Sequence, residues 1–192
     1  MARPRVRNRI LAAARTLLDK QGAGALTTRA VAEAAGVTEA SVFNNFGDKS
    51  GLVQAMIQET MPEFEALVSY IEKAPADDMA DWMGQLYTLA TRYLMAVFPL
   101  TAPKLTGFRP PMDAKAAEGY YTPRRALERR LAALQQSKTI SVSSPPQTLA
   151  LLIMGAAMHT ASTQLTLGQS DFDAATTGRE VGRALGFYNV SS

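Results

Sequence analysis

The chain has 192 residues, of which 47% are hydrophobic and 19% are charged, so it is long enough to bury a sizeable core. It contains no cysteine and a single histidine, His159, which excludes disulfide frameworks, thiolate metal sites and multi-histidine metal sites within one chain. The longest apolar run, residues 149–158, has ten residues, about half of the roughly 20 that span a bilayer. We therefore expect a cytoplasmic protein that has no membrane segment and needs no metal or other cofactor.

The net charge of +3 is unevenly distributed along the chain. The first 50 residues carry eight basic and four acidic side chains, whereas the remaining 142 carry 12 basic and 13 acidic ones. A basic head on a nearly neutral body favours a polyanionic partner for the head. A basic terminus that only aids solubility would give the same distribution, so charge alone leaves both interpretations open.

Apolar spacing and capping residues predict short helices in this basic head. The first helix carries its apolar residues at helical spacing: Ile10, Leu11, Ala14, Leu17 and Leu18. Thr27 and Thr38 are natural N-caps for two short helices over residues 28–35 and 39–46, which Gly36 and Gly47 end. Asp48 is expected to cap a fourth helix.

Two short helices joined by a tight glycine-containing turn and packed on a third form a helix-turn-helix. The second of the pair would enter the major groove of DNA. Its free side carries the short polar residues Ser41, Asn44 and Asn45, and asparagine can pair bidentately with adenine. A plain three-helix bundle without a DNA role would satisfy the same apolar pattern, so that alternative stays open here.

Four motifs follow one another in the head: Leu26-Thr27-Thr28-Arg29-Ala30-Val31-Ala32, Ala35-Gly36-Val37-Thr38, Val42-Phe43-Asn44-Asn45-Phe46 and Asp48-Lys49-Ser50-Gly51-Leu52-Val53. In order and spacing they resemble the tetracycline-repressor (TetR) family, over about residues 6–57. The resemblance implies an all-α, homodimeric transcriptional regulator, usually a repressor. It implies a helix-turn-helix DNA-binding domain over residues 1–48, which binds a palindromic operator, and a helical ligand-binding and dimerisation domain over residues 49–192.

The resemblance also implies roles for single residues. Thr28, Ser41 and Lys49 match positions that contact phosphate, and Arg29 matches a position that can reach a guanine edge. Asn44 and Asn45 match recognition-helix positions that mix base and backbone contacts. The predicted DNA-binding residues are Thr28, Arg29, Thr38, Ser41, Phe43, Asn44, Asn45 and Lys49.

Two residues of the head depart from the family pattern. Phe43 stands where the family usually has tyrosine, so a hydroxyl bond to phosphate is lost, although the ring can still pack against sugar or a thymine methyl. Glu39 places an acid at the start of the recognition helix, where it suits the helix dipole. It could accept from a cytosine amino group, but we expect it to face water. Arginines at the N-terminus could form a flexible arm that adds phosphate or minor-groove contacts: Arg3, Arg5, Arg7 and Arg9.

The rest of the chain predicts a helical bundle. The fourth helix should reach about residue 73, with a kink or break at Pro62, and further helices are expected over about 77–98, 122–136, 144–167 and 171–185. Residues 99–123 contain five prolines and are expected to be irregular, with a short helix at 102–106, and to form either a pocket rim or a surface loop. The helix over 77–98 is apolar on two faces, which places it at the centre of the bundle.

The body is expected to bind a small, mostly apolar effector. The predicted ligand-binding residues are Trp82, Leu86, Tyr93, Phe108, Met154, Met158 and His159. At helical spacing such residues also serve as plain core, and a lone histidine on an apolar helix favours a hydrogen-bonded core or interface position. The resemblance implies that the last two helices form the homodimer interface, and we predict the same here.

One motif suggests a different chemistry. Asp77-Asp78-Met79-Ala80-Asp81 has the form DDxxD, which holds magnesium against a diphosphate in prenyl-transferring enzymes. Such enzymes need a second acidic cluster, which the sequence lacks, and acids in a first turn suit the helix dipole. We therefore expect structural capping, no catalytic residue and no enzyme activity. The alternative function is that of a small-molecule-binding or enzymatic helical protein without operator recognition.

Overall fold

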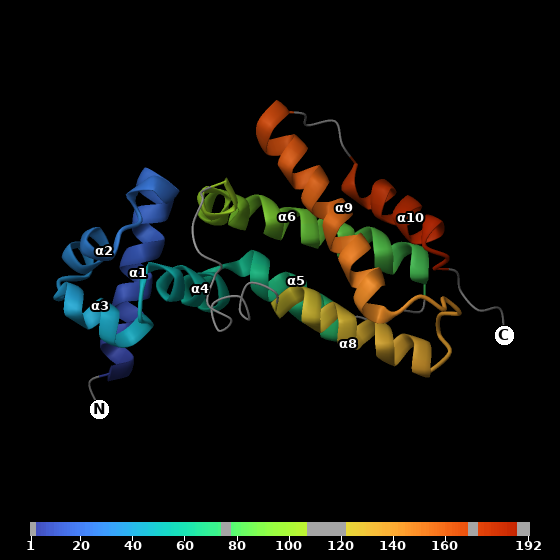
Figure 1. The fold of residues 1–192 in the computed structure, drawn as a ribbon, viewed down its shortest axis with the longest axis horizontal. Helices are drawn as coiled ribbons and strands as arrows, with labels where there is room; N and C mark the ends of the chain where they lie inside the picture. Colours follow the sequence, from blue (N-terminus) through green and yellow to red (C-terminus); the bar gives the residue numbers. More distant parts are fainter. Residues whose placement is uncertain (1–2, 74–77, 107–121, 169–172, 188–192) are drawn as a thin grey trace. The chain divides into compact units, whose positions relative to one another are not determined.

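The structure, a computed structural model, describes residues 3–73, 78–106, 122–168 and 173–187. Within these ranges it contains nine α-helices, one short 3-10 turn and no strand, which confirms the predicted all-α fold (Figure 1). The chain divides into two compact units, and the first break between them falls after Pro62.

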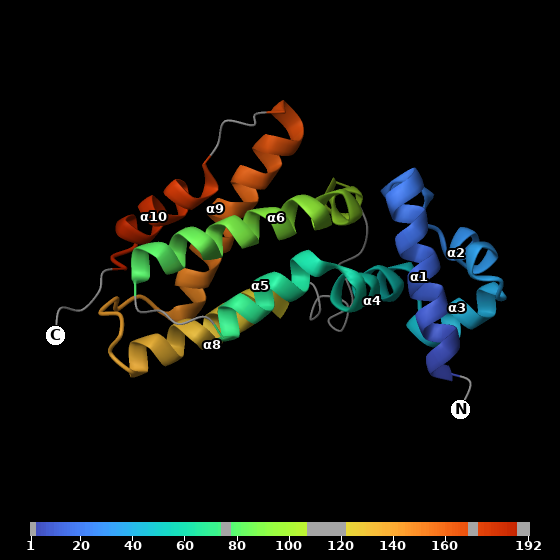
Figure 2. The same cartoon turned by 180° about the vertical axis from the view of Figure 1, so that it is seen from behind.

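The first unit contains the helices α1 (Arg3–Gln21), α2 (Thr28–Ala35), α3 (Glu39–Phe46) and α4 (Lys49–Thr60). Residues 99–106, the last part of a later helix, also belong to it. The bounds of α2 and α3 are those that the capping residues predicted. Residues from all four helices are buried together in one core: Ile10, Leu11, Ala14, Val31, Val42, Leu52, Val53 and Met56. Figures 1 and 2 both show α1, α2 and α3 gathered side by side. Because α4 packs against α1 and α3, this unit extends beyond the predicted boundary at residue 48.

The predicted break at Pro62 separates α4 from α5 (Pro62–Lys73). Met61, the residue before the proline, has extended backbone angles, with φ −97° and ψ 115°. A proline ring disfavours the helical region for the residue that precedes it, and proline itself is well tolerated in the first turn of a helix. One long helix is therefore replaced by two.

The second unit contains α5, the first part of α6 (Met79–Thr106), α8 (Thr122–Gln136), α9 (Pro146–Leu167) and α10 (Ala174–Ala184). The prediction that α6 ends near Phe98 was wrong, because the helix continues through Pro99 and Pro103 to Thr106. Each proline removes one backbone donor and usually breaks a helix, but here the helix continues past both. The short helix expected at 102–106 is the end of α6, and residues 107–121 lie outside the described ranges.

Helix α6 is central in the second unit, as predicted. Toward α5 it places Trp82 beside Tyr70, with ring centroids 6.4 Å apart, and Tyr93 beside Phe64, at 6.0 Å. Toward α9 it places the Tyr87 hydroxyl 2.8 Å from the hydroxyl of Thr160, both buried. Burial raises the pKa of Tyr87, so this hydroxyl stays protonated near neutral pH and the bond holds the two helices together.

Helix α10 packs on α6 through glycine. Gly178 and Gly182 are its buried residues, whereas its larger apolar residues Val181 and Leu185 are only half-buried. A Cβ atom at Gly178 would lie 2.5 Å from Cβ of Tyr87 and 2.6 Å from the carbonyl oxygen of Met83. The helices therefore approach too closely for any side chain at this position. In the part of the chain that the structure describes, no helix is both long and apolar enough to cross a membrane.

Candidate DNA-binding site

The turn between α2 and α3 is fixed by side chains that the sequence identifies. The Thr27 hydroxyl accepts from the backbone N–H of Ala30 at 3.0 Å and caps α2, which ends at Gly36 in the left-handed region, with φ 60°. The Thr38 hydroxyl accepts from the backbone N–H of Ser41 at 3.3 Å and caps α3. Each cap satisfies a backbone donor that a helix start leaves open, so the two helices meet at a defined angle.

Helix α3 turns a single free face outward. Val42 is buried, while Glu39, Ala40, Phe43 and Asn44 are exposed, and their spacing of one and four residues places them together. Phe43 is 46% exposed, although it is a large apolar side chain. The face thus presents a carboxylate, a methyl group, a phenyl ring and an amide. Asn44 and Phe43, two of the predicted DNA-binding residues, lie on it.

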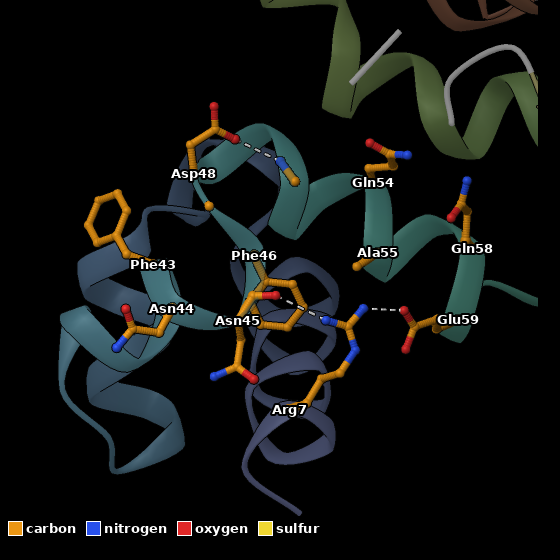
Figure 3. A pocket seen from close by; sticks show the side chains of 12 residues that line it. Arg7, Phe43, Asn44, Asn45, Phe46, Asp48, Gln54, Ala55, Gln58 and Glu59 are labelled. Carbon is orange, nitrogen blue, oxygen red and sulfur yellow. Dashed lines mark hydrogen bonds and ion pairs between the residues drawn. The ribbon is translucent and has the colours of Figure 1, made fainter. Parts of the chain in front are cut away.

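Arg7 holds the far end of α3 in place. Its guanidinium donates to the Asn45 carbonyl oxygen at 3.2 Å and to the Glu59 carboxylate at 2.5 Å, and it lies 4.6 Å from the centre of the Phe46 ring (Figure 3). A planar guanidinium suits such simultaneous bonding and stacking. Glu59 belongs to the last turn of α4, so Arg7 ties α1, α3 and α4 together.

This geometry corrects the expectation of a flexible arginine arm. Helix α1 already begins at Arg3, and Arg9 donates to the carbonyl oxygen of Gly36 at 3.2 Å. Both Arg7 and Arg9 therefore contribute to the packing of the helix-turn-helix. Arg7 lies three residues before Ile10 of the apolar stripe, and this shared helix side was the sequence signal that could have placed it inward.

A cleft of about 630 Å³ lies beside Arg7, between the end of α3 and α4. Asn45 lines it, is half-buried and donates from its amide to the Ser41 carbonyl oxygen at 2.7 Å. The two predicted asparagines therefore differ: Asn44 is free to contact a ligand, whereas the amide of Asn45 is engaged within its own helix. Figure 3 shows Phe43 and Asn44 directed away from Arg7.

The start of α4 requires a residue that the sequence analysis did not single out. A Cβ atom at Gly51 would collide with the carbonyl oxygen of Phe46. Asp48 accepts from the backbone N–H of Gly51 at 2.8 Å and caps the helix as predicted. The glycine lets α4 begin directly against the end of α3 and leaves Lys49, its first residue, exposed.

The predicted residues of α2 and of the turn have partners of their own. The Thr28 hydroxyl donates to the Glu39 carboxylate at 2.5 Å, so Glu39 does not simply face water as expected. Arg29 pairs with Glu33 at 3.3 Å on a fully open surface, where an ion pair is worth little and is easily exchanged. The hydroxyls of Thr38 and Ser41 lie 2.9 Å apart and bond to each other.

The predicted ligand-binding residues are not all in the same environment. Trp82, Leu86 and Tyr93 are buried in the second unit, where Nε1 of Trp82 has no hydrogen-bond partner among the described residues. On α9, the two methionines, Met154 and Met158, are half-buried. His159 is exposed, so of its two expected positions, core or interface, the core position is excluded. The remaining one, Phe108, lies outside the described ranges.

The described part of the DDxxD motif, residues 78–81, has a structural role. Asp78 accepts from the backbone N–H groups of Ala80 and Asp81 at 2.9 and 3.0 Å, as a helix cap does. Asp81 lies 3.6 Å from the guanidinium of Arg179 on α10. Among the described residues, no three acidic, histidine or cysteine side chains gather as a metal site would need.

Comparisons with known proteins agree with this geometry. Residues 10–56, which run from α1 into α4, match the family described as bacterial regulatory proteins, tetR family. The likeness to the tetR family therefore lies in this N-terminal stretch. Over 51 residues, 27% of this chain and 27% of the relative, it is 51% identical to YvkB of Bacillus subtilis, an uncharacterized HTH-type transcriptional regulator.

The likeness over the whole chain is one of fold. A Rhodococcus sp. protein ascribed to the TetR family superposes with a TM-score of 0.69 at 19% identity, covering 97% of this chain and 100% of that one. The transcriptional regulator FadR from Bacillus subtilis, solved in complex with stearoyl-CoA, gives a TM-score of 0.59 at 19% identity and covers 93% and 96%. This likeness of fold extends over the second unit as well as the first.

Proposed function

We propose that this protein is a ligand-responsive transcriptional regulator that represses genes by binding a palindromic operator. The observation that carries the proposal is the outward face of α3, where Glu39, Phe43 and Asn44 stand exposed on a helix fixed at both ends. A helical bundle with only a structural role does not need such a face. The major groove of DNA admits one helix, and short polar and apolar side chains read its base edges.

The proposed binding mode uses two copies of the chain. Two α3 helices would enter successive major grooves about 34 Å apart, one on each half of the palindrome. Lys49, Arg29 and the other basic residues of the head would neutralise phosphates, which makes binding salt-dependent. The base-reading contacts would come from α3.

A homodimer through the last two helices is supported by an apolar surface on α9. Its outward side carries large side chains that no other described helix covers: Leu151, Leu152, Leu165 and Leu167, with exposures from 41% to 67%. Gly155 and Met158 lie on the same side, and a Cβ atom at Gly155 would meet nothing within 4 Å. Contiguous apolar surface of this kind marks protein interfaces.

The proposed effector is a small, mostly apolar molecule that binds in the second unit. Trp82 and Tyr93 are buried there with aromatic partners on α5, and the unpartnered Nε1 of Trp82 favours a ligand with a hydrogen-bond acceptor. The FadR structure that shares this fold binds stearoyl-CoA, which has a long apolar chain. Such an effector would release the operator only by binding the released state more tightly.

Selection of genomic fragments by the purified protein at about 100 mM salt tests the proposal, since non-specific binding is already weakened there. The matched control is the Arg29→Ala/Asn44→Ala variant, because both side chains are exposed and neither is needed for packing. Enrichment of one palindrome by the wild type alone supports the proposal. Uniform binding that the variant shares would support the alternative, a helical ligand-binding protein or enzyme without operator recognition.

The repressor role has its own test. A reporter gene transcribed across the selected palindrome should be silenced when the protein is present, and transcription should return with the Arg29→Ala/Asn44→Ala variant. A reporter that is activated by the wild type would instead assign the protein as an activator.

A further inference from the structure

Glu39 is the only charged residue on the exposed face of α3, and it is negative. A carboxylate beside DNA is repelled by the phosphates, so without a compensating contact it weakens binding. The described residues give Glu39 one neutral partner, the Thr28 hydroxyl at 2.5 Å, and no ion pair. The acid is thus neither neutralised by the protein nor removed from the surface that would face DNA.

The bond from Thr28 fixes how the carboxylate is directed. Thr28 is the first residue of α2 and is half-buried, and its β-branched side chain has few rotamers. Its hydroxyl donates to Oε1 of Glu39, which leaves Oε2 free to accept another hydrogen bond. The Glu39 carboxylate is therefore a hydrogen-bond acceptor held in a fixed position. It lies on the same side of α3 as Phe43, which follows it by one helical turn.

Only one base offers this acceptor a suitable edge. In the major groove guanine presents two acceptors, thymine presents an acceptor and a methyl group, and adenine presents a donor beside the N7 acceptor. Cytosine alone presents a donor, its N4 amino group, without an acceptor on the same base. The acceptor atoms of guanine, thymine and adenine repel a fixed carboxylate to some degree, whereas the amino group of cytosine attracts it.

We propose that Glu39, held by Thr28, is a specificity-determining residue that reads a cytosine in each half of the operator. This inference rests on the proposed function and deepens it, because it names a base and the group that recognises it. Thr28 acts through Glu39 as a positioning residue. The role that the family resemblance implies for Thr28, a phosphate contact, competes with this one for the same hydroxyl.

The test starts with in vitro selection from random duplexes by four full-length proteins: wild type, Glu39→Ala, Glu39→Gln and Thr28→Val. We expect the wild-type site to contain a cytosine whose enrichment Glu39→Ala loses at that position only. Glutamine both donates and accepts and pairs bidentately with adenine, so Glu39→Gln should shift the preferred base from cytosine to adenine. A mere structural role for Glu39 would not change the identity of the preferred base.

A chemical substitution in the DNA gives the direct measurement. Replacing that cytosine by 2-pyrimidinone removes the N4 amino group and keeps the ring. The wild type should lose about tenfold in affinity, the usual effect of one lost base contact. For Glu39→Ala the same replacement should lower the affinity by less than about twofold, since the contact is already absent. Comparing the two proteins removes any effect of weaker base pairing, because both bind the same duplexes.

Thr28 variants separate its two possible roles. Thr28→Ser keeps the hydroxyl and should keep the cytosine preference, whereas Thr28→Val should weaken that preference. A Thr28→Val variant that loses affinity equally for all four bases would overturn the positioning role of Thr28. Identical selected sites for wild type and Glu39→Ala would overturn the inference and leave the proposed function intact, and the absence of any enriched site would overturn both.

Discussion

The two units of this chain place their polar and apolar side chains in opposite ways. In the first unit, short helices are fixed by caps and by Arg7, and α3 turns Glu39 and Asn44 outward. In the second unit, long helices bury aromatic residues such as Trp82, and α9 turns leucines outward. The proposed reading of DNA would need a rigid polar edge. The proposed binding of an apolar effector and of a second subunit would need apolar surface both inside and outside the unit.

The outward leucines of α9 should give the largest effect. Leu151→Asp places a charge on the proposed dimer surface, so we expect a monomer by sedimentation at micromolar concentration. Operator affinity should fall by about a hundredfold or more, because the two half-sites no longer bind together. Ala66→Asp, an exposed position on α5, is the matched control and should remain a dimer. A Leu151→Asp protein that still sediments as a dimer would contradict the assignment of the interface.

The glycine contact between α6 and α10 should be nearly as sensitive. Gly178→Ala forces a methyl group onto Tyr87 and Met83. We expect the free energy of unfolding to fall by about 2 kcal/mol, which is a typical cost of overpacking a core. Gly24→Ala, where a Cβ atom meets nothing within 4 Å, is the control and should leave the midpoint of thermal unfolding nearly unchanged. An unchanged midpoint for Gly178→Ala would mean that α10 is not packed as described.

Arg7 distinguishes positioning from phosphate binding in the first unit. Arg7→Met removes the bonds to Asn45 and Glu59, so operator affinity should fall about tenfold as α3 loses its support. The salt dependence of binding should stay the same, because we expect a guanidinium already bound to Asn45 and Glu59 to neutralise no phosphate. Lys49→Ala should instead reduce the slope of log affinity against log salt by about one. A reduced slope for Arg7→Met would mean that Arg7 contacts a phosphate.

The smallest expected effect is a pH-dependent cap in the second unit. Bonds from the hydroxyl and N–H of Thr176 hold the pKa of Asp173 below its ordinary value of 3.8. A lowered pKa in the folded state contributes stability above the ordinary value, and that contribution is lost as pH falls through the folded value. Asp173→Ala should therefore lower the unfolding temperature at pH 7 and differ less from wild type near pH 2.5. Asp173→Asn keeps a helix cap that does not titrate. If its unfolding temperature changed with pH as that of the wild type does, Asp173 would not be the titrating group.

The sequence predicts what local chemistry determines. Thr27, Thr38 and Asp48 act on backbone groups within three residues, so the helices of the first unit begin where those residues indicate. Contacts between residues distant in sequence escape such reasoning: Arg7 reaches Glu59 across 52 positions, and Gly178 is required by Tyr87 on another helix.

Local rules also fail at particular residues. Pro99 and Pro103 usually break a helix, yet α6 continues through both. His159 lies on an apolar helix, but α9 has an outward apolar side, so an apolar neighbourhood in sequence did not mean a buried one. For Glu39 the sequence left two orientations open, and its bond with Thr28 became apparent only once α2 and α3 were placed together.

The central claim is that α3 recognises one DNA sequence, and a competition experiment tests it most directly. The measurement is the ratio of dissociation constants for a shuffled duplex and the selected palindrome, at about 150 mM salt, with Asn44→Ala beside the wild type. We expect a ratio of at least about a thousandfold for the wild type, as specific DNA-binding proteins show, and a reduced ratio for Asn44→Ala. A ratio near one for the wild type would mean that the basic head binds DNA by charge alone, and the claim would be contradicted.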